Sequence, residues 1–412
     1  MKKAWILVTA VFLALSLTAF SGCNGGGSNN KPDDKIDIEK FPFYEEDYAL
    51  LSYDFGEEQM VRPFFLGNTI YNETVMPVDS GVEISGMLQF EPLKILSVRD
   101  FAWEREFVEG VDYTVSGRKL VLSPGSAIPY LTEENLRGVN VPQPYRKVDS
   151  ISNVETDFMM MGANVIYTEG TLVYGHQISV SYVYDVKDLS SDVYPRYMGD
   201  KLPKLSAKLK SGQPVNLAIT GDSVGEGCSS SKYFNRAPYM DNFITLAKDG
   251  LEREYGSDIT LVNLSKGGEK SAWGQAGQQI NKVVAAAPDV LFIHFGINDC
   301  GDRISANMFR DNIELLILQV RDELPDCEFV IINAFPPNFR TYDQSLMEQY
   351  WLKTAAIEKQ HSGVAVLDMY SQGVELLKNK KYMDVTGNGI NHLNDYSARL
   401  YAMSILSSLI EY

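Results

Sequence analysis

The stretch Val215-Asn216-Leu217-Ala218-Ile219-Thr220-Gly221-Asp222-Ser223 decides the fold of the C-terminal half of the chain. Its apolar run ends in a tight Gly-Asp-Ser turn, which is typical of a buried strand followed by a polar loop. Further short β runs occur at residues 259–263, 290–295, 329–333 and 364–368, with stretches of helical period at 309–324 and 346–360. Strands that alternate with helices predict a parallel sheet covered on both faces, with ligands bound at the carboxyl ends of the strands.

The N-terminal half has a different pattern. From residue 41 to about 186 the chain consists of short β runs separated by Gly, Pro and Asn clusters, and no helical period is sustained. Residues 119–122 and 177–183 alternate apolar and polar side chains, as in a sheet with one face in water. We therefore expect a β-sandwich domain at 41–186, a linker with one short helix at 187–213, and an α/β domain at 214–412.

The first residues read as an export signal. Lys2 and Lys3 precede an uncharged apolar run from residue 4 to 20, and Ser-Gly-Cys follows at 21–23. This is the layout of a secretory signal peptide, here residues 1–22. The small-small-Cys ending resembles a bacterial lipobox, with Phe20 where that motif usually has Leu, and it implies lipidation of Cys23. Residues 23–40 would then be a flexible tether that holds an exported lipoprotein on the membrane, at the cell surface or on the periplasmic side.

Charge and cysteine content exclude some classes of partner. The net charge of −17 argues against nucleic acid, whose binding needs clustered Lys and Arg. If Cys23 is acylated, three cysteines remain, Cys228, Cys300 and Cys327, so at least one thiol is free and no disulfide framework is expected. Whether Cys228 and Cys300 pair stays open.

Three short motifs follow successive predicted strands. Gly221-Asp222-Ser223 can present a hydroxyl in the crevice beyond the first strand. The Gly-rich turn at residues 263–268 offers backbone N–H groups to a developing oxyanion, and Asn298, in the Gly-Ile-Asn-Asp motif at 296–299, offers a side-chain amide to the same charge. Each motif also occurs in ordinary turns, so each is weak alone.

A serine nucleophile needs a nearby base, and the chain has only four histidines. His176 lies in the β region, His294 lies inside an apolar strand, and His361 precedes the last strand at the wrong end of the sheet. His392, in the loop before the final helix, is the one placed to reach the carboxyl edge.

The four blocks in this order resemble the SGNH, or GDSL, family of hydrolases over residues 214–412. The resemblance implies a three-layer α/β/α domain that hydrolyses esters or thioesters without a metal or cofactor. Carried over by position, Ser223 is the nucleophile and first oxyanion donor, Gly268 the second donor, Asn298 the third, and His392 the base. Ser265 stands where the family has Gly, a position peripheral to these donors.

One departure concerns the acid that orients the histidine. The family usually has Asp three residues before the histidine, and Gly389 stands there in this chain. Asp384 could fold back to His392 as the orienting acid. Asp395 is the weaker candidate, because it more readily caps the final helix. A backbone carbonyl is the third alternative, which would make a Ser-His dyad.

These expectations combine into a serine esterase on a lipid-anchored surface protein. A β domain beside an SGNH domain resembles carbohydrate esterases, so O-acetyl groups of a polysaccharide are the first choice of substrate. The β domain would bind glycan or shape the site. A lipase or thioesterase of the same fold is one alternative, and a glycan-binding lipoprotein with an inactive hydrolase domain is the other.

Overall fold

The computed structural model describes residues 38–162 and 164–412. The expected signal peptide, Cys23 and all of the expected tether up to residue 37 lie outside the described residues. Residues Asp37–Tyr412 form one compact unit. Within the part of the chain that the structure describes, no helix combines the length and apolarity needed to cross a membrane.

The C-terminal region is built on a five-stranded parallel sheet of strand order β14-β13-β15-β16-β17. Its strands are β13 (Val215–Gly221), β14 (Ile259–Asn263), β15 (Val290–His294), β16 (Glu328–Asn333) and β17 (Val364–Asp368). The chain moves to opposite sides of β13 for its next two strands, so the strand order reverses between β13 and β15. A crevice opens beyond the carboxyl ends of the strands at such a point.

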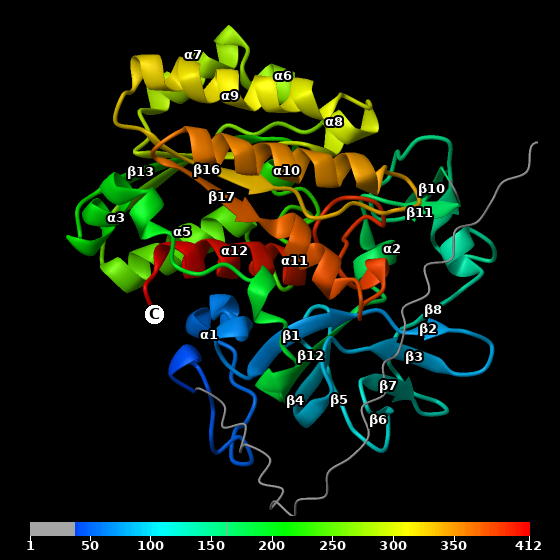
Figure 1. The fold of residues 1–412 in the computed structure, drawn as a ribbon. Helices are drawn as coiled ribbons and strands as arrows, with labels where there is room; N and C mark the ends of the chain where they lie inside the picture. The colour runs from blue at the N-terminus through cyan, green and yellow to red at the C-terminus, as the bar shows by residue number, and fades with distance from the viewer. Residues whose placement is uncertain (1–37, 163) are drawn as a thin grey trace, which may run out of the picture. The chain divides into compact units, whose positions relative to one another are not determined.

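Helices cover both faces of this sheet, as the sequence pattern predicted (Figure 1). Helices α7, α9 and α10 lie on one face, and α5 and α12 lie on the other. The helices of this region are α3 (Pro203–Lys210), α4 (Ser223–Glu226), α5 (Phe243–Tyr255), α6 (Ser271–Gly274), α7 (Gly277–Ala286), α8 (Ile297–Gly301), α9 (Ala306–Glu323), α10 (Gln344–Gln360), α11 (Met369–Leu376) and α12 (Asp395–Leu409). The expected three-layer α/β/α arrangement is confirmed.

The N-terminal region is rich in strands, consistent with the predicted β-sandwich. One sheet has the order β1-β12-β4-β5, a second β6-β7-β3-β2-β8, and a small third sheet β11-β10-β9. The elements are α1 (Glu57–Val61), β1 (Thr69–Val75), β2 (Val78–Asp79), β3 (Ile84–Met87), β4 (Pro92–Asp100), β5 (Glu106–Phe107), β6 (Tyr113–Ser116), β7 (Lys119–Leu122), β8 (Leu131–Thr132), β9 (Arg146–Lys147), β10 (Asp157–Met161), β11 (Val165–Tyr167), α2 (Thr171–Tyr174) and β12 (Ile178–Tyr184).

Strand β12 differs from its sequence expectation. Alternation over residues 177–183 predicted one face in water, but every residue of β12 is buried. Its polar positions are paired inside the protein: the hydroxyl of Ser181 accepts the backbone N–H of Asn72 at 2.8 Å. The neighbouring strand β1 contacts helix α12, which is itself buried at every residue. The face expected to meet water is therefore covered by the rest of the protein.

Buried charges join the N-terminal and C-terminal regions. Lys380 Nζ lies 2.5 Å from Glu73 Oε1, and neither side chain is exposed. The hydroxyl of Tyr182 donates to the other oxygen of Glu73 at 2.5 Å. Arg399 of α12 donates to two carbonyl oxygens of β1, at 2.9 and 2.6 Å. Because an unpaired buried charge is costly, these contacts hold the two regions in one relative position.

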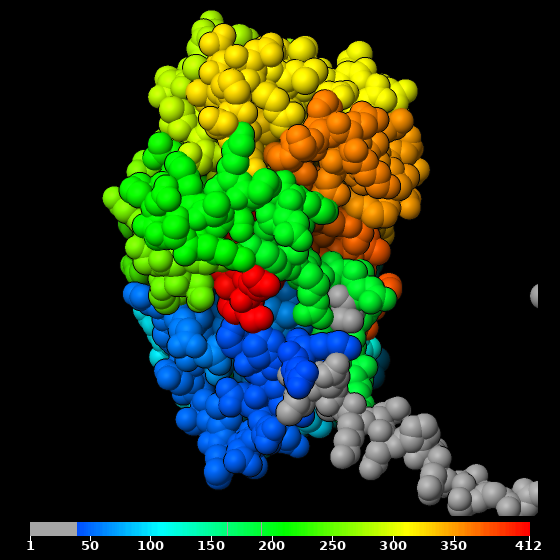
Figure 2. All heavy atoms as spheres, turned by 60° about the vertical axis from the view of Figure 1, so that its left-hand side comes forward, coloured from blue at the N-terminus to red at the C-terminus, as the bar shows by residue number. Residues whose placement is uncertain are grey.

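The last residues of the chain emerge where the two regions meet. Figure 2 shows this end (red) between the start of the β region (blue) and the α/β region (green). The ring of Tyr412 packs edge-on against that of Phe43, with centroids 5.0 Å apart. Helix α3 lies in the segment expected to be a linker with one short helix, and the backbone N–H of Leu205 in it donates to Glu328 of β16 at 2.8 Å.

Replacing Lys380 should destabilise the protein strongly. Lys380→Met leaves Glu73 buried without its cation, so we expect the free energy of unfolding to fall by about 3–5 kcal/mol. Urea unfolding of the purified protein measures the change. Lys210→Met, which removes an exposed ion pair with Glu411, is the matched control and should have a much smaller effect. Equal effects of the two variants would contradict the role of the buried pair.

Candidate active site

Ser223 lies at the carboxyl edge of the sheet, where the strand order reverses. It follows β13 and is the first residue of α4. Asp222 caps this helix by accepting the N–H of Val224 at 3.0 Å, and the same carboxylate lies 3.2 Å from His294 Nδ1. A side chain at Gly221 would come within 2.5 Å of the carbonyl oxygen of His294, so this strand-to-helix turn requires glycine.

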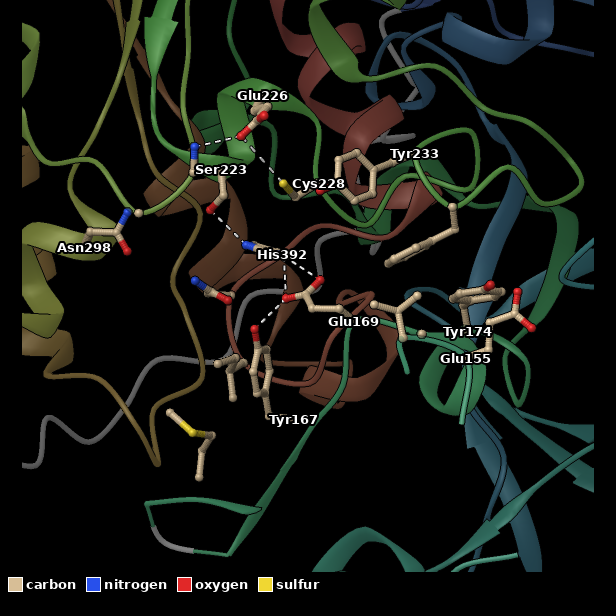
Figure 3. A pocket seen from close by; sticks show the side chains of 18 of the residues that line it. Glu155, Tyr167, Glu169, Tyr174, Ser223, Glu226, Cys228, Tyr233, Asn298 and His392 are labelled. Carbon is tan, nitrogen blue, oxygen red and sulfur yellow. Dashed lines mark hydrogen bonds and ion pairs between the residues drawn. The ribbon is translucent and has the colours of Figure 1, made fainter. Parts of the chain in front are cut away.

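His392 lies opposite Ser223 (Figure 3). Its Nε2 is 2.8 Å from the Oγ of Ser223. The loop around it is held by Asn388, whose Oδ1 accepts the N–H groups of residues 390, 391 and 392, each at 3.0 Å. The hydroxyl of Thr386 donates to the carbonyl of His392 at 2.9 Å. A serine hydroxyl bonded to an imidazole is the arrangement of an activated nucleophile.

The other three histidines are engaged elsewhere. His294 is fully buried beside Asp222. Nε2 of His361 lies 2.8 Å from Glu314, and Nδ1 of His176 lies 2.8 Å from the carbonyl of Leu172. None of these three contacts Ser223.

Hydrogen-bond donors line the same pocket as Ser223. The Ser223 N–H begins α4 and has no acceptor within that helix. The N–H of Gly268 has no acceptor among the described residues. Asn298, in α8, donates one amide hydrogen to the carbonyl of Glu269 at 2.9 Å, which orients the amide and leaves its second hydrogen available. The neighbouring N–H of Gly267 is taken, because it donates to Glu226 at 2.7 Å.

Neither expected acid orients His392. Asp384 is buried at another place, where it accepts the N–H of Met76 at 2.7 Å and that of Lys381 at 2.9 Å. Asp395 accepts the N–H of Ser231 at 2.8 Å, and Asn394, not Asp395, caps the final helix. The prediction that Asp384 orients His392 is therefore wrong: its carboxylate joins Met76, directly after strand β1, to Lys381.

A glutamate that the sequence did not single out contacts His392. Nδ1 of His392 lies 3.1 Å from Oε1 and 3.2 Å from Oε2 of Glu169, which follows β11 in the N-terminal region. The two residues are 223 positions apart in the chain, so no local motif links them. The only signal in the sequence was the absence of an acid at position 389.

The surroundings of Glu169 favour its charged form. Burial by itself raises its pKa, but the nearby His392 and hydrogen bonds from His392, Asn388 and Tyr167 outweigh this, and the net pKa is lowered. The carboxylate is therefore available as an acceptor at neutral pH.

Position 389 has no room for the family's aspartate. Gly389 has a φ of +92°, a conformation that favours glycine, and a Cβ there would lie 2.1 Å from the carbonyl oxygen of Ile166. Ile166 belongs to β11, so this strand occupies the space that a side chain at 389 would need.

A cleft of about 790 Å³ surrounds these groups. Both regions of the protein line it, which agrees with the expectation that the β domain could shape the site. Five aromatic side chains line it: Tyr167, Tyr174, Tyr233, Phe234 and Tyr342. Its charged lining consists of three carboxylates and one guanidinium among the described residues: Glu155, Glu169, Glu226 and Arg236.

The described part of the chain contains neither a cluster of metal ligands nor a disulfide. Within residues 38–162 and 164–412, no group of three or more His, Cys, Asp or Glu is arranged to hold a metal ion. Cys228, Cys300 and Cys327 are all free thiols, so Cys228 and Cys300 do not pair.

Comparison with known proteins assigns the C-terminal region to a family. Residues 219–400 match the model of the GDSL-like Lipase/Acylhydrolase family. A search among curated proteins found no match.

Several solved structures are similar to about half of the chain. A two-domain esterase active on acetylated mannans is 20% identical, with a TM-score of 0.41 over 51% of this chain, and the chain spans about half (52%) of that protein. The acetyl xylan esterase AlAXEase is 16% identical, with a TM-score of 0.39 over 48% of this chain and 100% of its own. The psychrotrophic esterase EstA from Pseudoalteromonas sp. is 16% identical, with a TM-score of 0.33 over 47% of this chain and 95% of its own. Taking the family match together with the site, residues 219–400 form a domain of the GDSL-like lipase/acylhydrolase family, the SGNH-type ester hydrolases.

Proposed function

We propose that the protein is a serine esterase that removes acyl groups, by first choice O-acetyl groups of a polysaccharide, through an acyl-enzyme on Ser223. The observation that carries this proposal is the 2.8 Å contact between Ser223 Oγ and His392 Nε2, two residues that line a cleft. The same contact argues against an inactive hydrolase domain, because nucleophile and base are already within hydrogen-bond reach.

The reaction follows from these groups. His392 Nε2 takes the proton of Ser223 as Oγ bonds to the acyl carbon, and the carbonyl electrons move to its oxygen. N–H groups of Ser223, Gly268 and Asn298 stabilise this oxyanion. When the intermediate collapses, the bond to the alcohol oxygen breaks and His392 returns the proton to the leaving alcohol. Water, deprotonated by His392, then attacks the acyl-enzyme, and its collapse releases the carboxylic acid and restores Ser223.

The lining of the cleft supports a saccharide as the alcohol part of the ester. Its aromatic side chains include Tyr233, which is 54% exposed, and Phe234, which stacks on Tyr174 with centroids 5.7 Å apart. The lining also includes Arg236 and Glu155, which form an ion pair between the two regions of the protein. Flat apolar faces beside polar groups suit sugar rings with their hydroxyls, whereas a long acyl chain would need a continuous apolar lining.

The charge of the cleft favours an uncharged substrate. Arg236 is paired with Glu155, and Glu226 is exposed with no cationic partner among the described residues. Because the carboxylates outnumber the single guanidinium, the cleft repels anions. Neutral glycan esters therefore fit it better than acidic glycans or phosphate-bearing thioesters.

Removing the Ser223 hydroxyl should abolish catalysis. We expect Ser223→Ala to lower kcat for 4-nitrophenyl acetate by about 10⁴–10⁶, because the nucleophile is lost while folding is kept. The absorbance of the released 4-nitrophenolate measures the rate. The control is Ser190→Ala, which replaces an exposed serine outside the cleft. Equal rates for the wild type and Ser223→Ala would remove the esterase proposal.

The amide of Asn298 should act on the transition state. Asn298→Ala is expected to lower kcat by about 10²–10³ with a smaller change in KM, since the lost hydrogen bond forms to the oxyanion. Steady-state kinetics separate the two constants, with the exposed helix residue Asn307 replaced by Ala as the control. A change confined to KM would show that Asn298 only binds substrate.

Neutral substrates should be preferred, and Glu226 should contribute to the preference. We expect acetate release from acetylated xylo-oligosaccharides to exceed that from acetylated galacturonate oligosaccharides, with the ratio falling as salt screens the charges. Glu226→Gln should lower this ratio by about 3- to 10-fold at low ionic strength. Glu104→Gln, an exposed carboxylate outside the cleft, is the control. A ratio insensitive to both salt and Glu226→Gln would refute the electrostatic selection.

A further inference from the structure

We propose that Glu169 is the positioning residue for His392, so that the N-terminal β region supplies the acid of a Ser223-His392-Glu169 triad. This inference rests on the proposed esterase function and deepens it. In this triad a carboxylate that follows strand β11 of the N-terminal region takes the place of the family's local aspartate, on the far side of the imidazole from Ser223 (Figure 3).

The geometry assigns the tautomer of His392. Nε2 faces the Ser223 hydroxyl at 2.8 Å, and Nδ1 faces both oxygens of Glu169 at 3.1 and 3.2 Å. A carboxylate can only accept, so Nδ1 carries the hydrogen and Nε2 presents its lone pair to the serine. This is the tautomer that a general base needs, and the same carboxylate stabilises the imidazolium that forms when the base takes its proton.

The carboxylate of Glu169 is itself fixed by three other donors. The hydroxyl of Tyr167 donates to Oε1 at 2.8 Å, the amide of Asn388 donates to Oε1 at 3.1 Å, and the hydroxyl of Ser229 donates to Oε2 at 3.0 Å. The side chain is 19% exposed, which limits competition from water. A carboxylate held in this way orients the imidazole of His392 far better than a mobile surface glutamate would.

Ser229 is the one other side chain near Nδ1, at 3.2 Å. Its hydroxyl hydrogen is directed to Glu169, and a neutral hydroxyl gives little stabilisation to an imidazolium. Ser229 therefore supports the carboxylate and does not replace it.

One strand accounts for both the loss of the local acid and its replacement. The carbonyl of Ile166 in β11 fills the space beside Gly389 that an aspartate side chain would need, and Glu169 follows the same strand two residues after it ends. The packing that excludes an acid at position 389 thus brings another acid to His392. Asn388 ties the two segments together, since its carbonyl accepts the N–H of Thr168 at 3.2 Å.

The experiment compares Glu169→Gln and Glu169→Asp with a control from the same region, Glu104→Gln, which removes an exposed carboxylate outside the cleft. All are assayed on 4-nitrophenyl acetate over a range of pH. Glu169→Gln should lower kcat by about 10²–10⁴ with a small change in KM, because the base loses its orientation and its charge partner. Glu104→Gln should stay within about threefold of the wild type.

The pH profile separates catalysis from a structural role. Removing the carboxylate takes away a charge that stabilises the imidazolium, so the acid limb of kcat/KM should move to lower pH. Glu169→Asp keeps the charge, so it should retain the acid limb near that of the wild type and recover part of kcat. A merely structural glutamate would lower activity without moving the limb.

A spectroscopic readout on the wild type covers the case in which Glu169→Gln does not fold. A far-downfield proton signal from His392 Nδ1–H, absent in His392→Ala, supports the hydrogen bond to a carboxylate, and its absence in folded wild type overturns the inference. Glu169→Gln kinetics equal to those of Glu104→Gln, with Ser223→Ala inactive, overturn the role of Glu169 alone. A wild type without Ser223-dependent hydrolysis overturns the esterase proposal and this inference together.

Discussion

The imidazole of His392 is held by two hydrogen bonds whose partners come from different parts of the chain. Ser223 belongs to the parallel sheet of the C-terminal region, and Glu169 belongs to the strand-rich N-terminal region. A misplacement of about 1 Å can cost a catalytic group much of its effect. The relative position of the two regions is therefore a condition of the proposed catalysis, and the rest of the structure can be understood from how it meets this condition.

Packing around helix α12 provides the required precision. All residues of this helix are buried, because the sheet and its helices enclose one side and strand β1 encloses the other. Burial lowers the pKa of Arg399 in this helix to about 10, yet its guanidinium still reaches the backbone of β1. The Arg399 guanidinium and the Lys380–Glu73 pair are directional contacts. They fix the relative position of two surfaces, which apolar packing alone would define less precisely. Such buried charges add little net stability, but a misaligned interface would leave them unpaired.

Features that depend on a local pattern of residues could be predicted from the sequence. The run that ends at Ser223, the alternation of strands and helices, and the position of His392 before the last helix all follow from periodicity and turn chemistry. Two features could not be predicted in this way. Strand β12 alternates like a half-exposed strand, and only tertiary packing buries its polar face. Glu169 lies 223 residues from its partner, and nothing near it in the chain distinguishes it from an exposed loop glutamate.

A distant acid has a consequence that a local one lacks. An aspartate three residues from the histidine moves with it, so local fluctuations leave the pair intact. Glu169 stays in place only while β11 remains docked against the loop at Gly389, and partial opening of such an interface costs less free energy than global unfolding. Opening would leave the Ser223–His392 contact but remove the carboxylate, which reduces the triad to a dyad. The proposed activity therefore depends on the docking of the β region, even though the proposed nucleophile, base and oxyanion donors all lie in the other region.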